Sequence, residues 1–144
     1  MGGERIGGVC ECLDNKRKPL NVAERSLIKG RVPYYGANGI QGYINDFIFN
    51  ETLVLLAEDG GNFEEFKEKP IAQIIKGKSW VNNHAHVLKG SKSILIEFLF
   101  YSVVHKDIRE CINGTSRSKL NKSEMLKIKL DIPMVLEQKK YLIF

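Results

Sequence analysis

His84 and His86 are the residues of this sequence whose type and spacing most readily suggest chemistry. They fall in an apolar segment that is typical of a β-strand, and alternate residues of a strand point to the same face of a sheet. With a carboxylate such as Asp59, two imidazoles on one face could bind a metal ion and form the centre of a metal-dependent nuclease. No His-Glu-x-x-His frame accompanies them, so we favour polar strand residues at a binding surface.

The pair Cys10 and Cys12 is a weaker metal candidate. A structural zinc ion needs four ligands, usually from paired Cys-x-x-Cys or Cys/His knuckles, and no second pair stands elsewhere in the sequence. The glycines near the start lack the strand–turn–helix context and the Gly-Lys-Ser ending of a phosphate loop. The sequence also lacks the Asn-Pro-Pro-aromatic motif with which amino-methyltransferases grip a base. We therefore predict no metal ligand, no catalytic residue and no bound cofactor.

Polar loops rich in amides, aromatic rings and cations are the remaining feature. Asn and Gln can bond adenine through two hydrogen bonds in the major groove, and Arg or Lys can address guanine. Lys, Tyr and backbone N–H groups suit phosphate oxygens. Such loops are often only turns, and that interpretation stays open. On the binding interpretation we predict contacts with DNA from eight residues, which are Tyr35, Asn38, Gln41, Asn82, Asn83, His84, Arg117 and Lys119.

Length and composition indicate one ordered domain. The chain has 144 residues, of which 43% are hydrophobic and 27% are charged, values ordinary for a globular protein. The net charge of +5 is compatible with a polyanionic partner, but many proteins without such a partner share it. The apolar run from Ile94 to Val104 is too short for a membrane span and contains Glu97. No signal peptide is visible, and three cysteines without one indicate a reduced, cytoplasmic protein.

The pattern of apolar residues predicts how the chain positions these loops. Continuous apolar runs at 53–57 and 71–75 indicate buried strands, and 79–88 is expected to form a third. Residues 5–13 suit a short strand or one turn of helix, residues 14–31 a basic loop, and residues 33–45 a turn between short strands. Turns are expected at 58–62 and 76–78, and residues 63–69 are acidic and solvated.

The second half of the chain is expected to supply the helices. Helical spacing predicts a helix over 92–112 that Gly114 would end, followed by a polar loop over 115–125 with Leu120 pointing inward. Apolar residues alternate over 126–132, which predicts a half-buried strand that Pro133 stops, and a last helix begins at Val135. The expected fold class is α+β, with a mixed, largely antiparallel curved sheet and one main packed helix.

Several of these segments, in this order, resemble the specificity subunits of type I restriction–modification systems. The resemblance covers about residues 6–141 and is carried by the order of its motifs. The motifs are Pro33–Ile44, Glu58–Asn62, Pro70–Gln73, Trp80–Leu88, the helix segment Phe98–Tyr101, Gly114–Asn121 and Leu136–Lys140.

The resemblance implies a function. Such subunits normally carry two recognition domains joined by long helices, and each domain reads one half of a split DNA site. Separate modification subunits methylate adenine with S-adenosylmethionine, and a restriction subunit cuts. For this chain the resemblance implies a DNA target recognition domain over 1–133, the start of a truncated spacer helix over 134–144, and no enzymatic activity of its own. Double-stranded DNA, the modification and restriction subunits, and a second copy of the chain are the implied partners.

The sequence departs from that family pattern, because it holds one recognition domain and little of the spacer helix. A half-subunit that dimerises, a non-functional truncated cassette and an excised fragment all fit this departure. Two other functions stay open beside DNA recognition. One is the metal-dependent nuclease with His84, His86 and Asp59, and the other is a protein-interaction module that uses the exposed end of the last helix.

Overall fold

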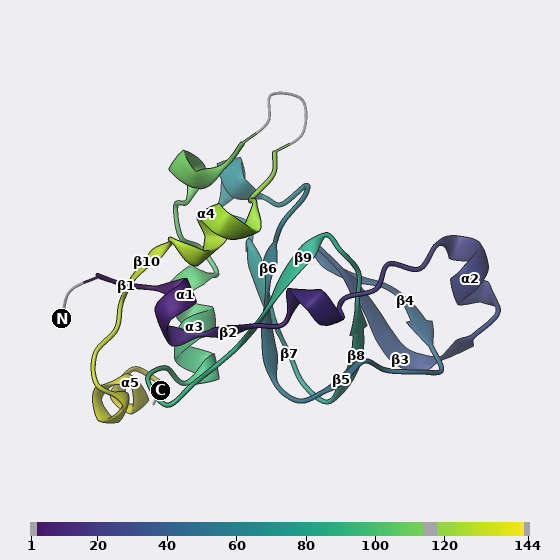
Figure 1. Cartoon of the computed structure of the whole chain (residues 1–144), viewed down its shortest axis with the longest axis horizontal. Helices are drawn as coiled ribbons and strands as arrows, with labels where there is room; N and C mark the ends of the chain where they lie inside the picture. The colour runs from purple at the N-terminus through teal and green to yellow at the C-terminus, as the bar shows by residue number, and fades with distance from the viewer. Residues whose placement is uncertain (1–2, 114–117, 143–144) are drawn as a thin grey trace.

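The computed structural model of the chain describes residues 3–113 and 118–142. The molecule has a strand-rich part and a helix-rich part, and the first and last described elements both lie in the helix-rich part (Figure 1). The strands are β1 (Gly3–Arg5), β2 (Glu11–Cys12), β3 (Lys29–Gly36), β4 (Gly39–Ile44), β5 (Phe49–Asn50), β6 (Leu53–Ala57), β7 (Ala72–Ile75), β8 (Lys78–Val81), β9 (Ala85–Lys89) and β10 (Lys129–Asp131). The helices are α1 (Ile6–Val9), α2 (Val22–Ser26), α3 (Ile96–Val103), α4 (Lys122–Leu126) and α5 (Val135–Tyr141), with single 3₁₀ turns at Asp14–Lys16, Phe63–Glu65 and Arg109–Cys111.

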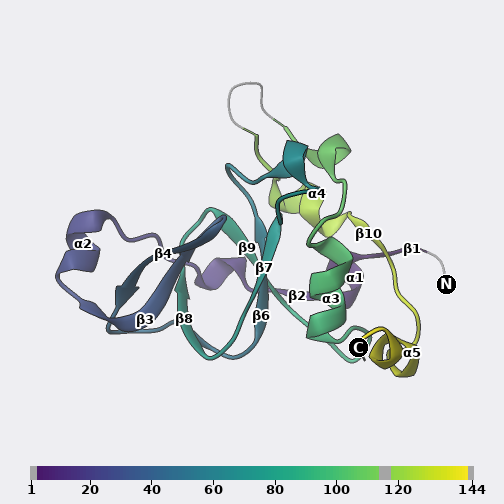
Figure 2. The same cartoon turned by 180° about the vertical axis from the view of Figure 1, so that it is seen from behind.

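The sheet topology confirms the expected α+β class. One four-stranded sheet has the order β2-β9-β6-β7, a second has the order β4-β3-β8-β5, and β1 pairs with β10. Among the described strands the pairing of β3 with β8 is parallel, and the other pairings are antiparallel. The hairpin β3–β4 and helix α2 project from the end of the molecule that lies away from α1, α3, α4 and α5 (Figures 1 and 2). The projecting hairpin brings its turn beside the loops that follow β6 and β8.

Strand β6 divides the core into two halves. Val54 and Leu56 pack into a cluster with α3, whereas Leu53 and Leu55 pack into a second cluster on the opposite face of the strand. All five residues of β6 are buried, which explains why its sequence is a continuous apolar run without alternation. Each buried leucine stabilises the fold by about 1.5–3 kcal/mol relative to an exposed one.

The prediction of a single strand over 79–88 is wrong. The segment forms β8 and β9 with a turn between them, because the Asn82 side chain accepts a 2.8 Å hydrogen bond from the backbone N–H of His84 and closes an Asx turn. His84 therefore lies in the turn, and His86 lies in β9 with no exposed surface. The expectation that both imidazoles share one strand face is therefore also wrong, because only His86 lies in a strand.

The helix predicted over 92–112 is also shorter than expected. Helix α3 ends at Val103, and the carbonyl oxygen of Val104 accepts a hydrogen bond from the N–H of Ile71 at 2.9 Å. A continuing helix would need that carbonyl for the N–H of Ile108. Val103 and Val104 are β-branched and favour helix only weakly, so the tertiary contact prevails. The helix-ending role predicted for Gly114 lies outside the described residues.

Two further segments differ from expectation. Residues 122–126 form α4, so the alternating pattern over 126–132 yields only the short strand β10, and Met125 fills the core from the helix. The expected loop over 14–31 contains α2, which a capping box of Asn21 and Glu24 starts. That box is readable in the sequence as Asn-x-x-Glu. Leu120 is fully buried, as predicted.

Helix α5 starts two residues after Pro133, as predicted. None of the helices in the described part of the chain is long and apolar enough to cross a membrane. The division into a domain over 1–133 and a helix segment over 134–144 stays a prediction.

Candidate functional site

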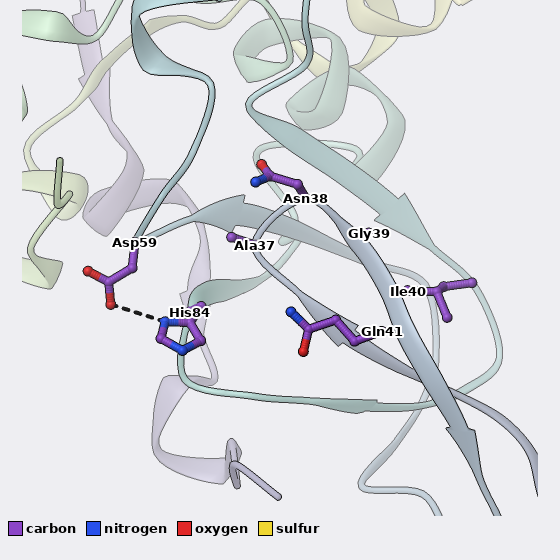
Figure 3. A pocket seen from close by; sticks show the side chains of 7 residues that line it. All are labelled: Ala37, Asn38, Gly39, Ile40, Gln41, Asp59 and His84. Carbon is purple, nitrogen blue, oxygen red and sulfur yellow. Dashed lines mark hydrogen bonds and ion pairs between the residues drawn. The ribbon is translucent and has the colours of Figure 1, made fainter. Parts of the chain in front are cut away.

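The turn of the β3–β4 hairpin lies beside two other loops and encloses a hollow of about 460 Å³ with them. Figure 3 shows Asn38 and Gln41 on the hairpin, across from Asp59 and His84. Three segments far apart in the sequence therefore contribute to one surface. The residues that line the hollow are Ala37, Asn38, Gly39, Ile40, Gln41, Asp59 and His84.

Asn38 and Gln41 are exposed and each keeps hydrogen-bonding capacity for a ligand. The Nδ2 of Asn38 donates to the carbonyl oxygen of Gly60 at 3.0 Å, and the Oε1 of Gln41 accepts from the Nδ2 of Asn82 at 3.3 Å. Among the described residues, neither the Oδ1 of Asn38 nor the Nε2 of Gln41 has a partner. Gly36 makes room for Gln41, because a Cβ at Gly36 would overlap the Gln41 amide.

Asn82 supports this surface from below. It is 4% exposed, its backbone N–H donates to the carbonyl of Tyr35 at 3.0 Å, and its side chain bonds Gln41 and His84. Tyr35 is half-buried and packs against the core cluster on the Leu55 face of β6. Burial, followed by the charge of Tyr43, raises the pKa of Tyr35. Direct contact of Asn82 and Tyr35 with DNA stays a prediction.

The turn between β8 and β9 carries Asn83 and His84. Asn83 is exposed, and the Nδ1 of His84 lies 3.2 Å from the Oδ2 of Asp59. The carbonyl of His84 accepts from the backbone N–H of Glu58 at 2.8 Å, which ties this turn to the loop after β6. Lys119 is exposed on a third loop, where its Nζ lies 3.8 Å from the Oε2 of Glu58. Arg117 lies outside the described residues.

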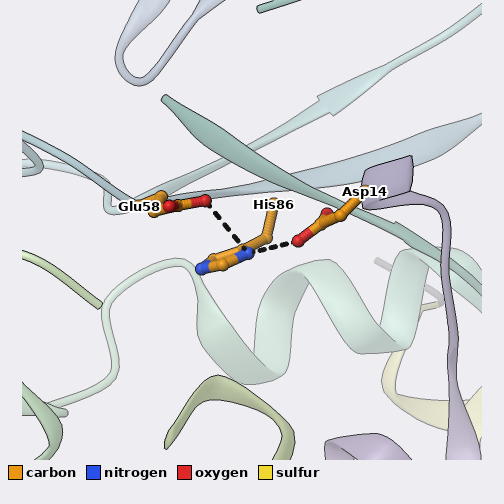
Figure 4. A group of neighbouring side chains, drawn as sticks. All are labelled: Asp14, Glu58 and His86. Atoms are coloured by element: carbon orange, nitrogen blue, oxygen red, sulfur yellow. Dashed lines mark hydrogen bonds and ion pairs between the residues drawn. The ribbon is translucent and has the colours of Figure 1, made fainter. Parts of the chain in front are cut away.

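A buried cluster of charged side chains, which the sequence analysis did not find, lies beneath these loops. It consists of Asp14, Arg17, Glu58 and His86, and Figure 4 shows three of them. The Nδ1 of His86 is 2.7 Å from the Oδ2 of Asp14, and a guanidinium nitrogen of Arg17 is 2.7 Å from the Oε1 of Glu58. Asp14 and His86 are separated by 72 positions, so no local spacing signals the cluster.

Asp14 is ionised within this cluster. Burial raises its pKa, but the hydrogen bonds from His86 and from the N–H of Val87, together with the charges of His86 and Arg17, lower the pKa by more than burial raises it. The net effect is a pKa below the ordinary value of 3.8.

The cluster is the group in the described part of the chain that could hold a metal ion. One ligand atom each from Asp14, Glu58 and His86 lies within 4.8 Å of the others. The guanidinium of Arg17 contacts both carboxylates, at 2.7 Å from Glu58 and 3.7 Å from Asp14, so both already have a cationic partner. The donor set therefore fits an internal ion network better than a metal site.

The nuclease constellation is not assembled. His84 contacts Asp59, whereas His86 faces away into the cluster with Asp14 and Glu58. The two imidazoles thus serve separate carboxylates.

Comparison with known proteins agrees with the sequence resemblance. The sequence profile of the type I restriction modification DNA specificity domain matches residues 4–144. A protein of Haemophilus influenzae assigned as a type I restriction enzyme specificity subunit is 34% identical over 126 residues. The match covers 87% of this chain and 31% of that protein, so the chain spans about a third of the length of this relative.

Solved structures share the fold. The S subunit of a type I restriction–modification system from M. genitalium superimposes with a TM-score of 0.76 at 13% identity, over 96% of this chain and 36% of that chain. The HsdS subunit of Thermoanaerobacter tengcongensis gives a TM-score of 0.63 at 11% identity, over 96% of this chain and 34% of that chain. Because the family profile matches nearly the whole sequence, this chain belongs to the type I restriction modification DNA specificity domain family.

Proposed function

We propose that this chain recognises one part of a bipartite double-stranded DNA target for a type I restriction–modification complex. The observation that carries the proposal is the convergence of Asn38, Gln41 and His84 on one hollow at the turn of the β3–β4 hairpin. The family and its restriction-system relative support DNA as the ligand. No catalytic role is proposed for the chain, and S-adenosylmethionine is proposed to bind only in the modification subunit.

The chemistry of this surface suits base edges. The Oδ1 of Asn38 can accept a hydrogen bond and the Nε2 of Gln41 can donate one, and the exposed amide of Asn83 can do both. Lys119, on the neighbouring loop, would contact phosphates and fix the orientation of the domain on the duplex. The same role is proposed for Arg117, which lies outside the described residues. We therefore propose base readout at the hollow and phosphate contact beside it.

Titration of labelled duplex at several salt concentrations tests this proposal. The preferred site is first found by mapping methylated positions in cells with and without the gene. One small domain makes few phosphate contacts, so non-specific binding should fall near 10⁻⁴–10⁻⁶ M, roughly, at physiological salt, and weaken steeply as salt rises. Binding that ignores salt, or no binding at low salt, would refute the proposal.

Two variants separate the two kinds of contact. Lys119→Ala should weaken binding to all sequences alike and reduce the salt slope by about one. Asn83→Ala should cost about 1–3 kcal/mol on the preferred site only, because it removes a base contact. Equal losses on all sequences in both variants would show that the assignment of reading loops is wrong.

Assembly with partner subunits is part of the proposal. Helix α5 would begin the spacer that joins recognition domains, and the residues Met134 and Leu136 there are 82% and 73% exposed. These apolar side chains support a docking role for this end of the chain, toward a second copy or toward the modification subunit. Light scattering after size-exclusion chromatography, alone and with the modification and restriction subunits, tests each partner. We propose a cytoplasmic location, where the complex would meet genomic DNA.

A further inference from the structure

We infer that Arg17 and His86 are positioning residues of the proposed DNA-reading surface, which they hold through the buried charged cluster and without touching DNA themselves. The inference rests on the proposed function. From the sequence, residues 14–31 are expected only to form a basic loop, and no role is assigned to Arg17.

Arg17 joins three parts of the chain through one guanidinium group. Its Nε donates to the carbonyl oxygen of Asp14 at 2.9 Å, and one terminal nitrogen donates to the Oε1 of Glu58 at 2.7 Å. The same nitrogen donates to the carbonyl oxygens of Ala85 at 3.0 Å and Asn83 at 3.3 Å. Its side chain is 16% exposed, so its donors are directed inward and are little available to a phosphate.

His86 joins the cluster to the loop that carries Lys119. Its Nε2 lies 2.7 Å from the carbonyl oxygen of Leu120, and its Nδ1 lies 2.7 Å from the carboxylate of Asp14. The imidazole therefore links the Asp14 carboxylate to the backbone of the loop that carries Lys119. Within the cluster the guanidinium of Arg17 contacts both carboxylates, which meets the need of buried charges for a partner.

The loops at residues 58–60, 83–86 and 118–120 are consequently held together by hydrogen bonds. Backbone hydrogen bonds run from Leu120 N–H to the Glu58 carbonyl at 2.8 Å and from Gly60 N–H to the Ser118 carbonyl at 3.3 Å. The N–H of Glu58 donates in turn to the carbonyl of His84 at 2.8 Å. Loops held in place before binding lose less conformational entropy when DNA binds. The resulting gain in affinity is expected mainly at the base contacts, because these need correct geometry.

Loss of Arg17 should therefore affect sequence preference and leave the phosphate contacts intact. The carboxylate of Glu58 would lose its nearest cation, and the carbonyls of Asn83 and Ala85 would lose their donor. The loops could then move relative to one another. The preference for the target over a scrambled duplex should fall by about 10- to 100-fold, the range of one or two base contacts, whereas the salt slope should stay unchanged.

The test uses the full chain and three variants. Arg17→Lys keeps the charge but loses the planar fork that reaches several acceptors. His86→Gln removes the imidazole that links Asp14 to the Leu120 carbonyl. Lys16→Met is the matched control, since Lys16 is the exposed cation next to Arg17 in the same turn. Each variant is titrated with target and scrambled duplexes at several salt concentrations. Hydrogen exchange is followed at residues 58–60, 83–86 and 118–120.

We expect Arg17→Lys and His86→Gln to lose preference for the target over the scrambled duplex at an unchanged salt slope. Hydrogen exchange should become faster in all three loops. Lys16→Met should leave preference and loop exchange unchanged. A folded Arg17→Lys variant that keeps its preference, or one that loses affinity uniformly with a salt slope lower by about one, overturns the inference. Wild-type loops that exchange with widely different protection overturn it as well, even if the variants fail to fold. A wild-type chain that does not bind DNA refutes the proposed function instead, while the exchange data still decide whether the cluster couples the loops.

Discussion

Replacement of Gln138 by leucine should destabilise the chain by about 2–3 kcal/mol, because this side chain joins α5 to the rest of the fold. Gln138 has no exposed surface. Its Oε1 accepts from the N–H of Leu95 at 2.8 Å, and its Nε2 donates to the carbonyls of Ser93 at 2.7 Å and Pro133 at 2.9 Å. Leucine has a similar volume and can make none of these bonds, so three backbone groups lose their partner at once.

The magnitude follows from the surroundings of those three groups. A buried donor or acceptor left without a partner costs about 1–3 kcal/mol, and a lost hydrogen bond whose groups can reach water costs about 0.5–1.5 kcal/mol. Ser93 is exposed, and Leu95 and Pro133 are half-buried. We assign the larger cost to the amide of Leu95, smaller costs to the two carbonyls, and a partial offset to the added apolar burial of leucine.

Urea unfolding of the wild type, Gln138→Leu and Lys140→Leu measures this cost. Lys140 is an exposed residue of the same helix, so Lys140→Leu controls for a leucine placed on α5. Gln138→Glu adds a charge-sensitive arm, since a carboxylate would face two carbonyl oxygens at neutral pH and could donate to one of them only when protonated. The carbonyl oxygens would raise the folded-state pKa of this carboxyl, so the deficit of this variant should shrink as pH falls from neutral toward the unfolded pKa of about 4.3 and change little below it. A loss in Gln138→Leu below about 0.5 kcal/mol, or no larger than in the control, would refute the reasoning.

Three further predictions concern single side chains. Burial, with a smaller effect of Cys12, raises the pKa of Cys10 to about 12. Iodoacetamide at pH 8 should therefore alkylate Cys10 in the folded chain on the order of 10³-fold more slowly than in urea, which peptide mass spectrometry measures. Rapid labelling of the folded chain would contradict this prediction. Folding lowers the pKa of Asp14, so its contribution to stability is present above the ordinary pKa of 3.8 and is lost as pH falls through the folded pKa. The difference in unfolding free energy between wild type and Asp14→Asn should therefore narrow in acid. A difference that does not change with pH would exclude this linkage. Gly36→Ala should displace Gln41 and weaken binding to the preferred site, whereas Gly8→Ala, where a Cβ meets nothing within 4 Å, should not; equal binding by both variants would contradict the close contact.

Much of the fold is readable from the sequence where one principle acts alone. The apolar run 53–57 is a buried strand because both faces of β6 pack against core, and the last helix begins at Val135 as predicted. The sequence misleads where a tertiary contact competes with a local pattern. The helical spacing of 92–112 continues past Val103, but the Val104 carbonyl is taken by Ile71. Alternation over 126–132 cannot show that its first residues complete a helix.

The candidate site divides in a similar way. Amide-rich turns are visible in the sequence, and Asn38, Gln41 and His84 do converge on one hollow. The sequence does not show how exposed each amide side chain is, because burial depends on which distant segments pack against it. Asn82 and Asn83 are neighbours of the same residue type, yet one is buried beneath Gln41 and the other is exposed.

The buried charged cluster changes how the net charge of the chain bears on DNA binding. A count of 22 Lys and Arg residues treats every cation as available to phosphates, but Arg17 is already committed to Glu58 and to backbone carbonyls. Two of the 17 acidic residues, Asp14 and Glu58, are similarly hidden from a phosphate backbone by their partners. An acidic residue beneath a DNA-reading loop would repel the ligand if it stood alone. Paired within the protein, it leaves the potential at the surface to the exposed cations, and it allows the loops to be held by strong ionic contacts that do not compete with DNA.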